Sequence, residues 1–561
     1  MQHLMTIRNW NMTRITKEKV RSSTISFLFI IAYVNMFQLV FGPENSIVGV
    51  IFTIMMSASM VRDLTAAPVR HLLIQSIVLV WMAAAAYLVN TLSAPLSFTV
   101  DFITILIILY AFTYEYSNHM YFPYILSYLF LVFISPADAG QLPRRLIGML
   151  AGAVSIILYQ WFMGRNRAAE TASDVLAGMI DDILLLIAHK NRETPEPPSP
   201  SDMPRSLSRL SQMVYERRRR VLCVSDAAFS MISAGRGLER LLLLVRELPA
   251  GLSVPDQNLL RHTEAVLEMF RAFICRESDK LPTADFCRVS PSGSVRTSEQ
   301  FCGTLLYIRD QLLHMADPQR KSHCHRTALS VKVRIQAALD LSPVRAAYAV
   351  RTALLLACAT LLVQSCPLPH GRWLMFTLAS VSLPYADDVP AKMKKRLAAT
   401  LAGGLVSVAV YSLVPSAAGR TAAMMLSGYI SFYFTDYALT FACSTVGALG
   451  GAVFMEAFGV QAVAHIFLIR LGYILAGIAV AFAANCLLLP YTRKMATSHL
   501  WKKYNTSSEL LAGIGRSGQT DPQLYYHLVI QSYLLEEKLA QNGAMPRPLN
   551  RGTCPDAARI C

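Results

Sequence analysis

The sequence is poor in charged residues and contains none of the common nucleotide-binding or hydrolase motifs. Charged side chains make up 16% of the 561 residues, whereas soluble domains usually carry about 25%. A P-loop, a GxSxG motif and an HExxH motif are all absent from the chain. These absences argue against an ATP-driven pump and a membrane hydrolase. We therefore expect no enzymatic activity and no catalytic residues.

Metal sites and a cleaved signal peptide are not indicated either. The eleven cysteines form no CxxC pair, and the "HCH" at His323–His325 has no partners at ligand spacing. We therefore expect no metal and no other cofactor, and thiols that stay reduced. The first apolar run is followed by "GPEN" rather than by the small residues of a cleavage site.

Apolar residues make up 54% of the chain and gather in twelve runs. A membrane-spanning helix needs about 20 apolar residues, so the shorter runs require flanking residues to complete a span. The sequence therefore predicts an all-α membrane protein. The runs form two sets of six: 24–41, 47–60, 72–92, 102–112, 121–134 and 146–163, then 352–363, 373–383, 397–414, 421–434, 438–455 and 462–489.

The positions of the basic residues predict the orientation of the chain. Lys and Arg accumulate in cytoplasmic segments, and five of them precede the first run, whereas the turn 42–46 carries none. We therefore expect a multi-pass protein of the cell (inner) membrane with both termini in the cytoplasm. The predicted segments are a cytoplasmic N-terminus (1–23), a first six-helix membrane repeat (24–164), a helical cytoplasmic domain (165–343), a second six-helix membrane repeat (344–490) and a cytoplasmic C-terminal tail (491–561).

The net charge of +16 fits this placement. Basic cytoplasmic segments face an anionic lipid surface, so membrane lipids are expected partners and nucleic acid is not. In the region between the two sets, Ala172–Lys190 places apolar residues at helical spacing with acidic residues among them. This pattern predicts a soluble helical bundle that connects the two membrane parts.

A short phrase recurs in the apolar runs. "RLIGMLAG" begins at Arg145, "RLAATLAG" at Arg396 and "RLGYILAG" at Arg470, and the first and third copies are 325 residues apart. Its Ala-Gly pair lets helix backbones approach closely. We predict two parallel repeats of six transmembrane helices, related by a pseudo-two-fold axis along the membrane normal. Substrate is expected near the interface between the repeats.

The arginine of this phrase is the candidate functional residue. Arg470 falls about eight residues into its apolar run, where a charge costs at least ~2.5–3.5 kcal/mol unless it faces water or a partner. Arg470 is therefore either functional or closer to the helix end than the run suggests. The alternative for all three arginines is a helix-contact face whose guanidinium groups reach lipid headgroups. That alternative is strongest for Arg396, which has basic neighbours.

The layout of six helices, a helical insert and six more helices resembles the fusaric acid resistance family, which is related to the aromatic acid exporters. The stretch "HGRWLMFTLASVSLPYADDVPAKMKKRLAATLAGG" at His370–Gly404 carries the resemblance, with Trp373 entering a helix and Arg396 before an Ala/Gly helix. Gly42–Arg70 resembles the corresponding part of the first half. The third run of the first half departs from the pattern, because it reads "VRHLLIQSIVLV" without the Arg phrase.

The resemblance implies an efflux transporter of aromatic or amphipathic carboxylate anions across the bacterial cell membrane, driven by protons. Guanidinium groups within the membrane suit this function, because they bind carboxylates in a bidentate manner and offset their desolvation. Arg145 and Arg470 would contact the anion, and Arg396 would lie at the inner mouth. Glu115 and Asp436 are candidate proton carriers, or else loop acids at the cytoplasmic surface.

Two other functions remain open at this point. A passive anion channel could use the same scaffold, and a membrane-anchored scaffold or sensor could act through the cytoplasmic helical domain. A small organic anion is the expected substrate in the transport hypotheses. The formation of a homo-oligomer, the identity of the substrate and the coupling ion are left open by the sequence.

Overall fold

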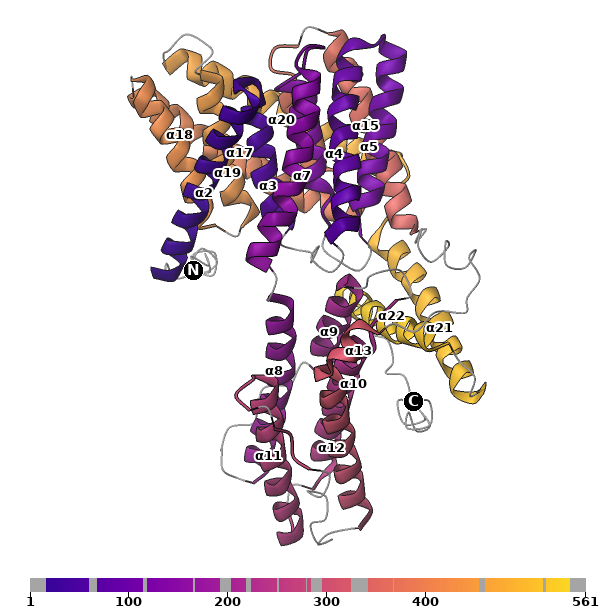
Figure 1. Ribbon diagram of the computed structural model, residues 1–561. Coiled ribbons are helices and arrows are strands. Elements are labelled where there is room, and N and C mark those ends of the chain that lie inside the picture. The colour runs from indigo at the N-terminus through magenta and orange to yellow at the C-terminus, as the bar shows by residue number, and fades with distance from the viewer. Residues whose placement is uncertain are drawn as a thin grey trace, which may run out of the picture. The chain divides into compact units, whose positions relative to one another are not determined.

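The computed structural model describes the protein over fifteen segments, and its regular structure there is helical (Figure 1). These segments are residues 17–59, 68–114, 119–164, 167–191, 203–217, 223–249, 252–278, 280–283, 295–323, 342–366, 368–414, 416–434, 436–453, 460–517 and 521–544. The chain divides into two compact units. Unit 1 contains the described residues within Met1–Ser59, Val69–Leu158 and Ser342–Arg493, and unit 2 those within Met60–Pro68, Tyr159–Leu341 and Lys494–Cys561.

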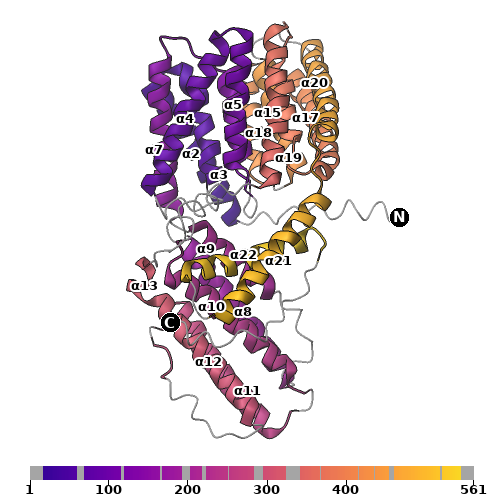
Figure 2. The ribbon, with the colours of Figure 1, turned by 90° about the vertical axis from the view of Figure 1, so that its right-hand side faces the viewer.

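Unit 1 holds two groups of helices that run side by side (Figure 2). A short 3-10 helix follows the first helix of the first group, and another precedes α17. The first group is α2 (Lys17–Phe41), η2 (Pro43–Asn45), α3 (Ser46–Ser59), α4 (Pro68–Thr91), α5 (Ala94–Phe112), α6 (Tyr121–Phe133) and α7 (Leu142–Gly164). The second group is α15 (Pro343–Ser365), α16 (Arg372–Val381), η4 (Ala386–Asp388), α17 (Val389–Leu413), α18 (Ala417–Ser431), α19 (Tyr437–Val453) and α20 (Val460–Leu487).

Each of the twelve predicted runs coincides with one of these α-helices. Within the described residues, seven helices are long and apolar enough to cross a membrane: α2, α4, α5, α7, α15, α17 and α20. The all-α, multi-pass prediction is therefore supported. That all twelve helices cross the bilayer, and that the two groups are parallel repeats, stay predictions.

Local sequence signals set several helix ends. Gly42 separates α2 from η2 with a φ of 93°, a conformation that L side chains rarely adopt. Pro343 opens α15, a position where its missing N–H costs nothing. The Ser416 hydroxyl caps α18 by accepting a hydrogen bond from the Gly419 N–H.

The Ala-Gly pairs of the recurring phrase lie at helix contacts, as the sequence predicts. A Cβ atom at Gly152 of α7 would overlap the Phe52 ring of α3, and one at Gly403 of α17 would overlap the backbone of α19. At Gly477 of α20 a Cβ would lie 2.9 Å from Thr377 of α16. Neighbouring helices therefore pack too closely for any larger residue at these positions.

The two groups of helices contact each other in a reciprocal manner. At one end of the α5–α15 pair, Arg345 donates from Nε and Nη2 to the Tyr110 carbonyl oxygen at 3.2 and 2.6 Å. At the other end, the Ser97 hydroxyl donates to Gln364 Oε1 at 3.4 Å, so the two helices are antiparallel. The α2–α18 contact includes the hydroxyl pair of Thr24 and Tyr429 at 2.9 Å. The first helix of each group thus meets the fourth helix of the other.

Unit 2 is a bundle in which α10 packs against α8, α9 and α12, while α11 packs against α8 and α22 against α9. The α9–α22 contact includes a hydrogen bond between the Ser208 hydroxyl and the Glu537 carboxylate. Residues 491–561, predicted as a tail, thus contribute a helix to this bundle. The bounds are α8 (Arg167–Lys190), α9 (Met203–Arg217), α10 (Asp226–Glu247), α11 (Val254–Ile274), α12 (Val295–Ala316), α13 (Pro318–Ser322), α21 (Arg493–Ser517) and α22 (Pro522–Gln541).

Candidate functional site

The three arginines predicted to bind substrate all lie inside unit 1 and are buried. Arg145 of α7, Arg396 of α17 and Arg470 of α20 expose 2%, 4% and 7% of their surface. Arg396 was expected just before its helix. It lies inside the helix instead, seven residues after Val389, the first residue of α17. Glu115, one of the two predicted proton carriers, lies outside the described residues, as do two residues of the "HCH" motif.

Arg145 is surrounded by hydrogen-bond acceptors from its own group of helices. Its Nε donates to Asn45 Oδ1 at 3.0 Å, and its Nη2 donates to the Glu44 carbonyl at 3.1 Å and the Ser135 hydroxyl at 2.9 Å. Its Nη1 donates to the Ser135 carbonyl. Four hydrogen bonds thus fix the start of α3 and the end of α6 to α7, and few donors remain for a ligand.

Arg470 has a different environment. Its Cζ lies 5.1 Å from the centroid of the Trp373 ring at the start of α16. Among the described residues no carboxylate, carbonyl or hydroxyl accepts a hydrogen bond from this guanidinium, and its buried Nε has no partner. Arg470 is therefore a buried cation that lies against an aromatic ring, and its Nε is unsatisfied among the described residues.

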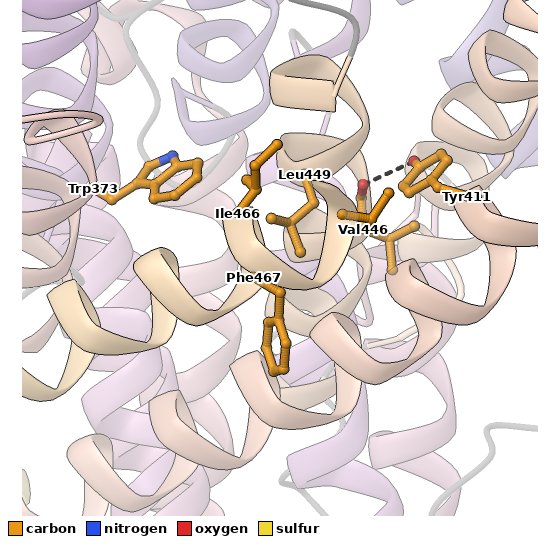
Figure 3. Close-up of a cluster of buried hydrophobic side chains, with 7 residues drawn as sticks. Trp373, Tyr411, Val446, Leu449, Ile466 and Phe467 are labelled. Atoms are coloured by element: carbon orange, nitrogen blue, oxygen red, sulfur yellow. Dashed lines mark hydrogen bonds between the residues drawn. The ribbon is translucent and has the colours of Figure 1, made fainter. Parts of the chain in front are cut away.

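The residues that precede Arg470 on α20 pack into an apolar cluster (Figure 3). Phe467 and Ile466 lie in this cluster with Trp373, and the Tyr411 hydroxyl donates to the Val446 carbonyl at 2.9 Å within it. A Cβ atom at Gly404 of α17 would overlap the Phe467 ring, so α17 and α20 are in close contact here. The cluster fixes the helix that carries Arg470. It also keeps water from one side of the guanidinium.

Arg396 is the second cation of this region. Its Cζ lies 4.3 Å from the centroid of the Phe441 ring of α19, and its buried Nε has no hydrogen-bond partner among the described residues. The Tyr437 hydroxyl interacts electrostatically with this guanidinium but forms no well-oriented hydrogen bond with it. Arg396 is near enough to act electrostatically on Arg470. Two buried guanidinium groups therefore share one region of unit 1, and neither forms an ion pair in the part of the chain that the structure describes.

The comparison with protein families places this region within a known class. Residues 356–484 match the model of the family described as Fusaric acid resistance protein-like. The chain carries a fusaric acid resistance protein-like region. This match confirms the resemblance predicted from the sequence for the segment from α15 to α20. Searches of the curated proteins and of the solved structures found no match.

The fusaric acid resistance protein-like region includes Trp373, Arg396 and Arg470, whereas Arg145 lies outside it. Aromatic rings lie against three cations of this region, Lys392, Arg396 and Arg470. Lys392, one turn before Arg396, has its Nζ 3.4 Å from the centroid of the Tyr437 ring. Cations over aromatic faces gain roughly 0.5–2 kcal/mol from the ring quadrupole. The rings thus hold the cations in place while leaving their N–H donors unused.

Asp436, the second predicted proton carrier, precedes α19 of the same region and is half-exposed. Its Oδ1 accepts a hydrogen bond from the Ala438 N–H at 2.8 Å, and its Oδ2 lies 3.5 Å from Lys395 Nζ. Partial burial acts to raise the pKa of Asp436, but the N–H groups of Ala438 and Leu439 and the charge of Lys395 outweigh it and lower that pKa. Asp436 is therefore ionised at neutral pH, as the loop-acid alternative expects. Its role in proton coupling stays a prediction.

Two further buried charged residues were not singled out from the sequence. Arg351 of α15 donates from Nη2 to the Leu383 carbonyl at 2.6 Å and from Nη1 to the Leu489 carbonyl at 3.3 Å. It ties the ends of α16 and α20 together. Asp101 of α5 is an acid with 1% of its surface exposed. A sequence signal existed for Asp101, because the predicted run 102–112 starts directly after it.

Proposed function

We propose that the protein is a membrane transporter that exports a small aromatic or amphipathic carboxylate, and that Arg396 and Arg470 bind this anion. The observation that carries the proposal is the buried Arg470 guanidinium without an acceptor. A lone charge in apolar surroundings costs at least ~2.5–3.5 kcal/mol. A binding site can contain such an unfavourable charge because the bound anion offsets its cost. The seven apolar helices and the fusaric acid resistance protein-like region support a transport function.

The geometry favours a carboxylate with an apolar or aromatic body. A guanidinium presents parallel N–H donors that match the two oxygens of a carboxylate. Trp373 and Phe441 lie against the two guanidinium groups and offer flat apolar surfaces to the rest of such a molecule. Two positive groups that form no ion pair among the described residues select against cations. Arg145 has a structural role in this proposal, because its donors already bind protein acceptors.

The proposal also includes the arrangement of two parallel repeats of six helices. The reciprocal contacts α5–α15 and α2–α18 support this arrangement. A two-fold axis between the repeats makes the first helix of each repeat contact the fourth helix of the other. Transporters built this way move their substrate by rocking one repeat against the other. The loop charges support a location in the inner membrane with both termini in the cytoplasm, and the family resemblance supports proton-driven export.

Transport by the purified full chain in liposomes tests the proposal. The probe is radiolabelled phthalate, an aromatic carboxylate that stays ionised and crosses lipid slowly. We expect wild-type protein to move phthalate and Arg470→Met to lose this transport. Arg470→Lys, which keeps the charge without the planar fork, should retain part of it. Lys394→Ala is the matched control, because Lys394 is an exposed cation on α17 and its removal should leave transport unchanged.

The outcomes separate the hypotheses. Normal phthalate transport by correctly inserted Arg470→Met would remove this residue from the mechanism. Current that follows the phthalate gradient in a bilayer recording, without any dependence on a pH gradient, would favour the passive channel. A transporter instead accumulates phthalate against its gradient when a pH gradient is imposed.

A further inference from the structure

Asp101 is an acid buried between the two groups of helices in unit 1. It lies on α5, the helix that packs along α15, and exposes 1% of its surface. Seven residues separate it from the N-terminal end of α5 and eleven from the C-terminal end, or about 10 and 16 Å along the helix axis. Asp101 is therefore far from both ends of an apolar helix.

The hydrogen bonds of this carboxyl group are incomplete. The Tyr128 hydroxyl of α6, itself fully buried, donates to Asp101 Oδ1 at 2.8 Å. The other oxygen, Oδ2, has no hydrogen-bond partner among the described residues. The Thr360 hydroxyl of α15 acts on the same carboxyl group without a well-oriented hydrogen bond, and its oxygen also has no partner. The carboxyl group of α5 and the hydroxyl group of α15 are thus neighbours, and each has an oxygen atom without a hydrogen-bond partner among the described residues.

No cation of the described residues forms an ion pair with Asp101. From α6 the titratable group facing it is Tyr128, and from α4 the neighbouring contact is the Trp81 indole, which donates to Thr104 at 3.1 Å. Arg345 of α15 is a cation that contacts α5, but it lies over the Tyr110 ring, nine residues further along α5 than Asp101. An ionised carboxyl group at this position therefore lacks charge compensation.

A proton would remove the uncompensated charge of this site. Asp101 carboxylate plus one proton gives the neutral carboxylic acid, and the Tyr128 hydroxyl continues to donate to Oδ1. No buried charge then remains. Gain or loss of this proton therefore changes the charge at the contact between α5 and α15.

We propose that Asp101 is the proton-binding residue that couples proton movement to anion transport. This inference rests on the proposed function, and it moves the coupling site away from Glu115 and Asp436. The site belongs to the contact between the two groups of helices, which is the surface that changes when repeats rock. A proton bound or released at Asp101 therefore alters how the two groups hold each other.

The first test separates coupling from anion movement. Full-length protein in liposomes is assayed for phthalate exchange at equal pH and for phthalate accumulation driven by a pH gradient. We expect Asp101→Asn, a permanent mimic of the neutral acid, to lose accumulation and keep exchange. Asp138→Asn is the matched control, because Asp138 is an exposed acid of the same unit. Accumulation by Asp101→Asn at the wild-type level would overturn the inference.

The second test measures the proton directly and does not depend on the substrate. Infrared difference spectra of the reconstituted protein at two pH values should contain the stretching band of a protonated carboxyl group. That band should be absent from Asp101→Asn and shifted in Tyr128→Phe, which keeps the acid and removes one hydrogen bond. An unchanged band in Asp101→Asn would overturn the inference. If wild-type protein moves no phthalate, the proposed function fails for this anion, while the infrared band still decides whether Asp101 binds a proton.

Discussion

Arg145 in α7 and Arg470 in α20 stand at the first position of the same sequence phrase and are both buried, but their surroundings differ. Arg145 donates hydrogen bonds to acceptors at the start of α3 and the end of α6. Arg470 has an aromatic ring beside it and no acceptor among the described residues. One phrase thus produces a structural contact in the first group of helices and an unsatisfied cation in the second.

Burial of a charged residue therefore does not by itself identify a ligand site. The number of acceptors around the charge separates the two cases, because a satisfied guanidinium stabilises the fold whereas an unsatisfied one destabilises it. Removing the charge should therefore have opposite effects on stability in the two regions.

Arg145→Met should have the largest effect on folding. The substitution leaves the acceptors of Asn45, Glu44 and Ser135 without their donor, and each buried acceptor left unsatisfied costs about 1–3 kcal/mol. We expect a marked fall in the yield of folded protein and in its thermal unfolding midpoint in detergent. An unchanged midpoint would contradict the structural role given to Arg145.

Arg470→Met should stabilise the protein in the absence of anion, whereas Arg145→Met destabilises it. Replacing an unpaired buried charge by an apolar side chain of similar length removes an electrostatic cost of about 2.5–3.5 kcal/mol. We expect the unfolding midpoint of the ligand-free protein to rise. Benzoate should raise the midpoint of the wild type and have no effect on the variant, while benzamide, which carries no charge, is the control. A lower midpoint for Arg470→Met would show that its guanidinium supports the fold.

Glycine substitutions should affect both regions alike. Gly152→Ala in α7 and Gly404→Ala in α17 each drive a Cβ into an aromatic ring, of Phe52 and Phe467 respectively. Overpacking of this kind costs about 1–3 kcal/mol. Gly451→Ala in α19 is the control, because a Cβ there has open space around it. Unequal losses in thermal midpoint for the two variants would indicate that the two contacts are not equivalent.

The smallest effect is expected for Asp436→Asn. Its pKa is lowered, so its contribution to stability is present above the unfolded-state value near 3.9 and is lost as the pH falls through the folded-state pKa. The exposed pair with Lys395 is worth about 0.2–1 kcal/mol. We expect the pH dependence of transport near neutrality to be unchanged by Asp436→Asn. A shifted transport profile would restore this residue as a proton carrier.

The helices themselves could be predicted from the sequence, because apolar runs of spanning length have few other uses. The α6 helix ends within one residue of its predicted run, whereas α5 and α15 extend through charged residues at which the runs were cut. One run was started directly after Asp101 and another directly after Arg351, and both residues are buried inside the helices. A composition rule treats a charge as the border of a membrane segment, so it leaves buried charges such as these outside the segment.

The distinction between the arginines could not be predicted. Arg145, Arg396 and Arg470 share a phrase, and its Ala-Gly pair predicted the close helix contacts correctly. What surrounds each guanidinium depends on residues far along the chain, such as Asn45 for Arg145 and Trp373 for Arg470. Since neither contact is local, no periodicity or spacing near the arginine encodes it.

The contact between Thr24 of α2 and Tyr429 of α18 also has a consequence for biosynthesis. These residues are 405 positions apart, and a ribosome that adds roughly 5–20 residues per second needs about 20–80 s to travel between them. During that interval α2 has emerged while its partner helix does not yet exist. Until α18 is made, lipid or an insertion chaperone must therefore cover this face of α2.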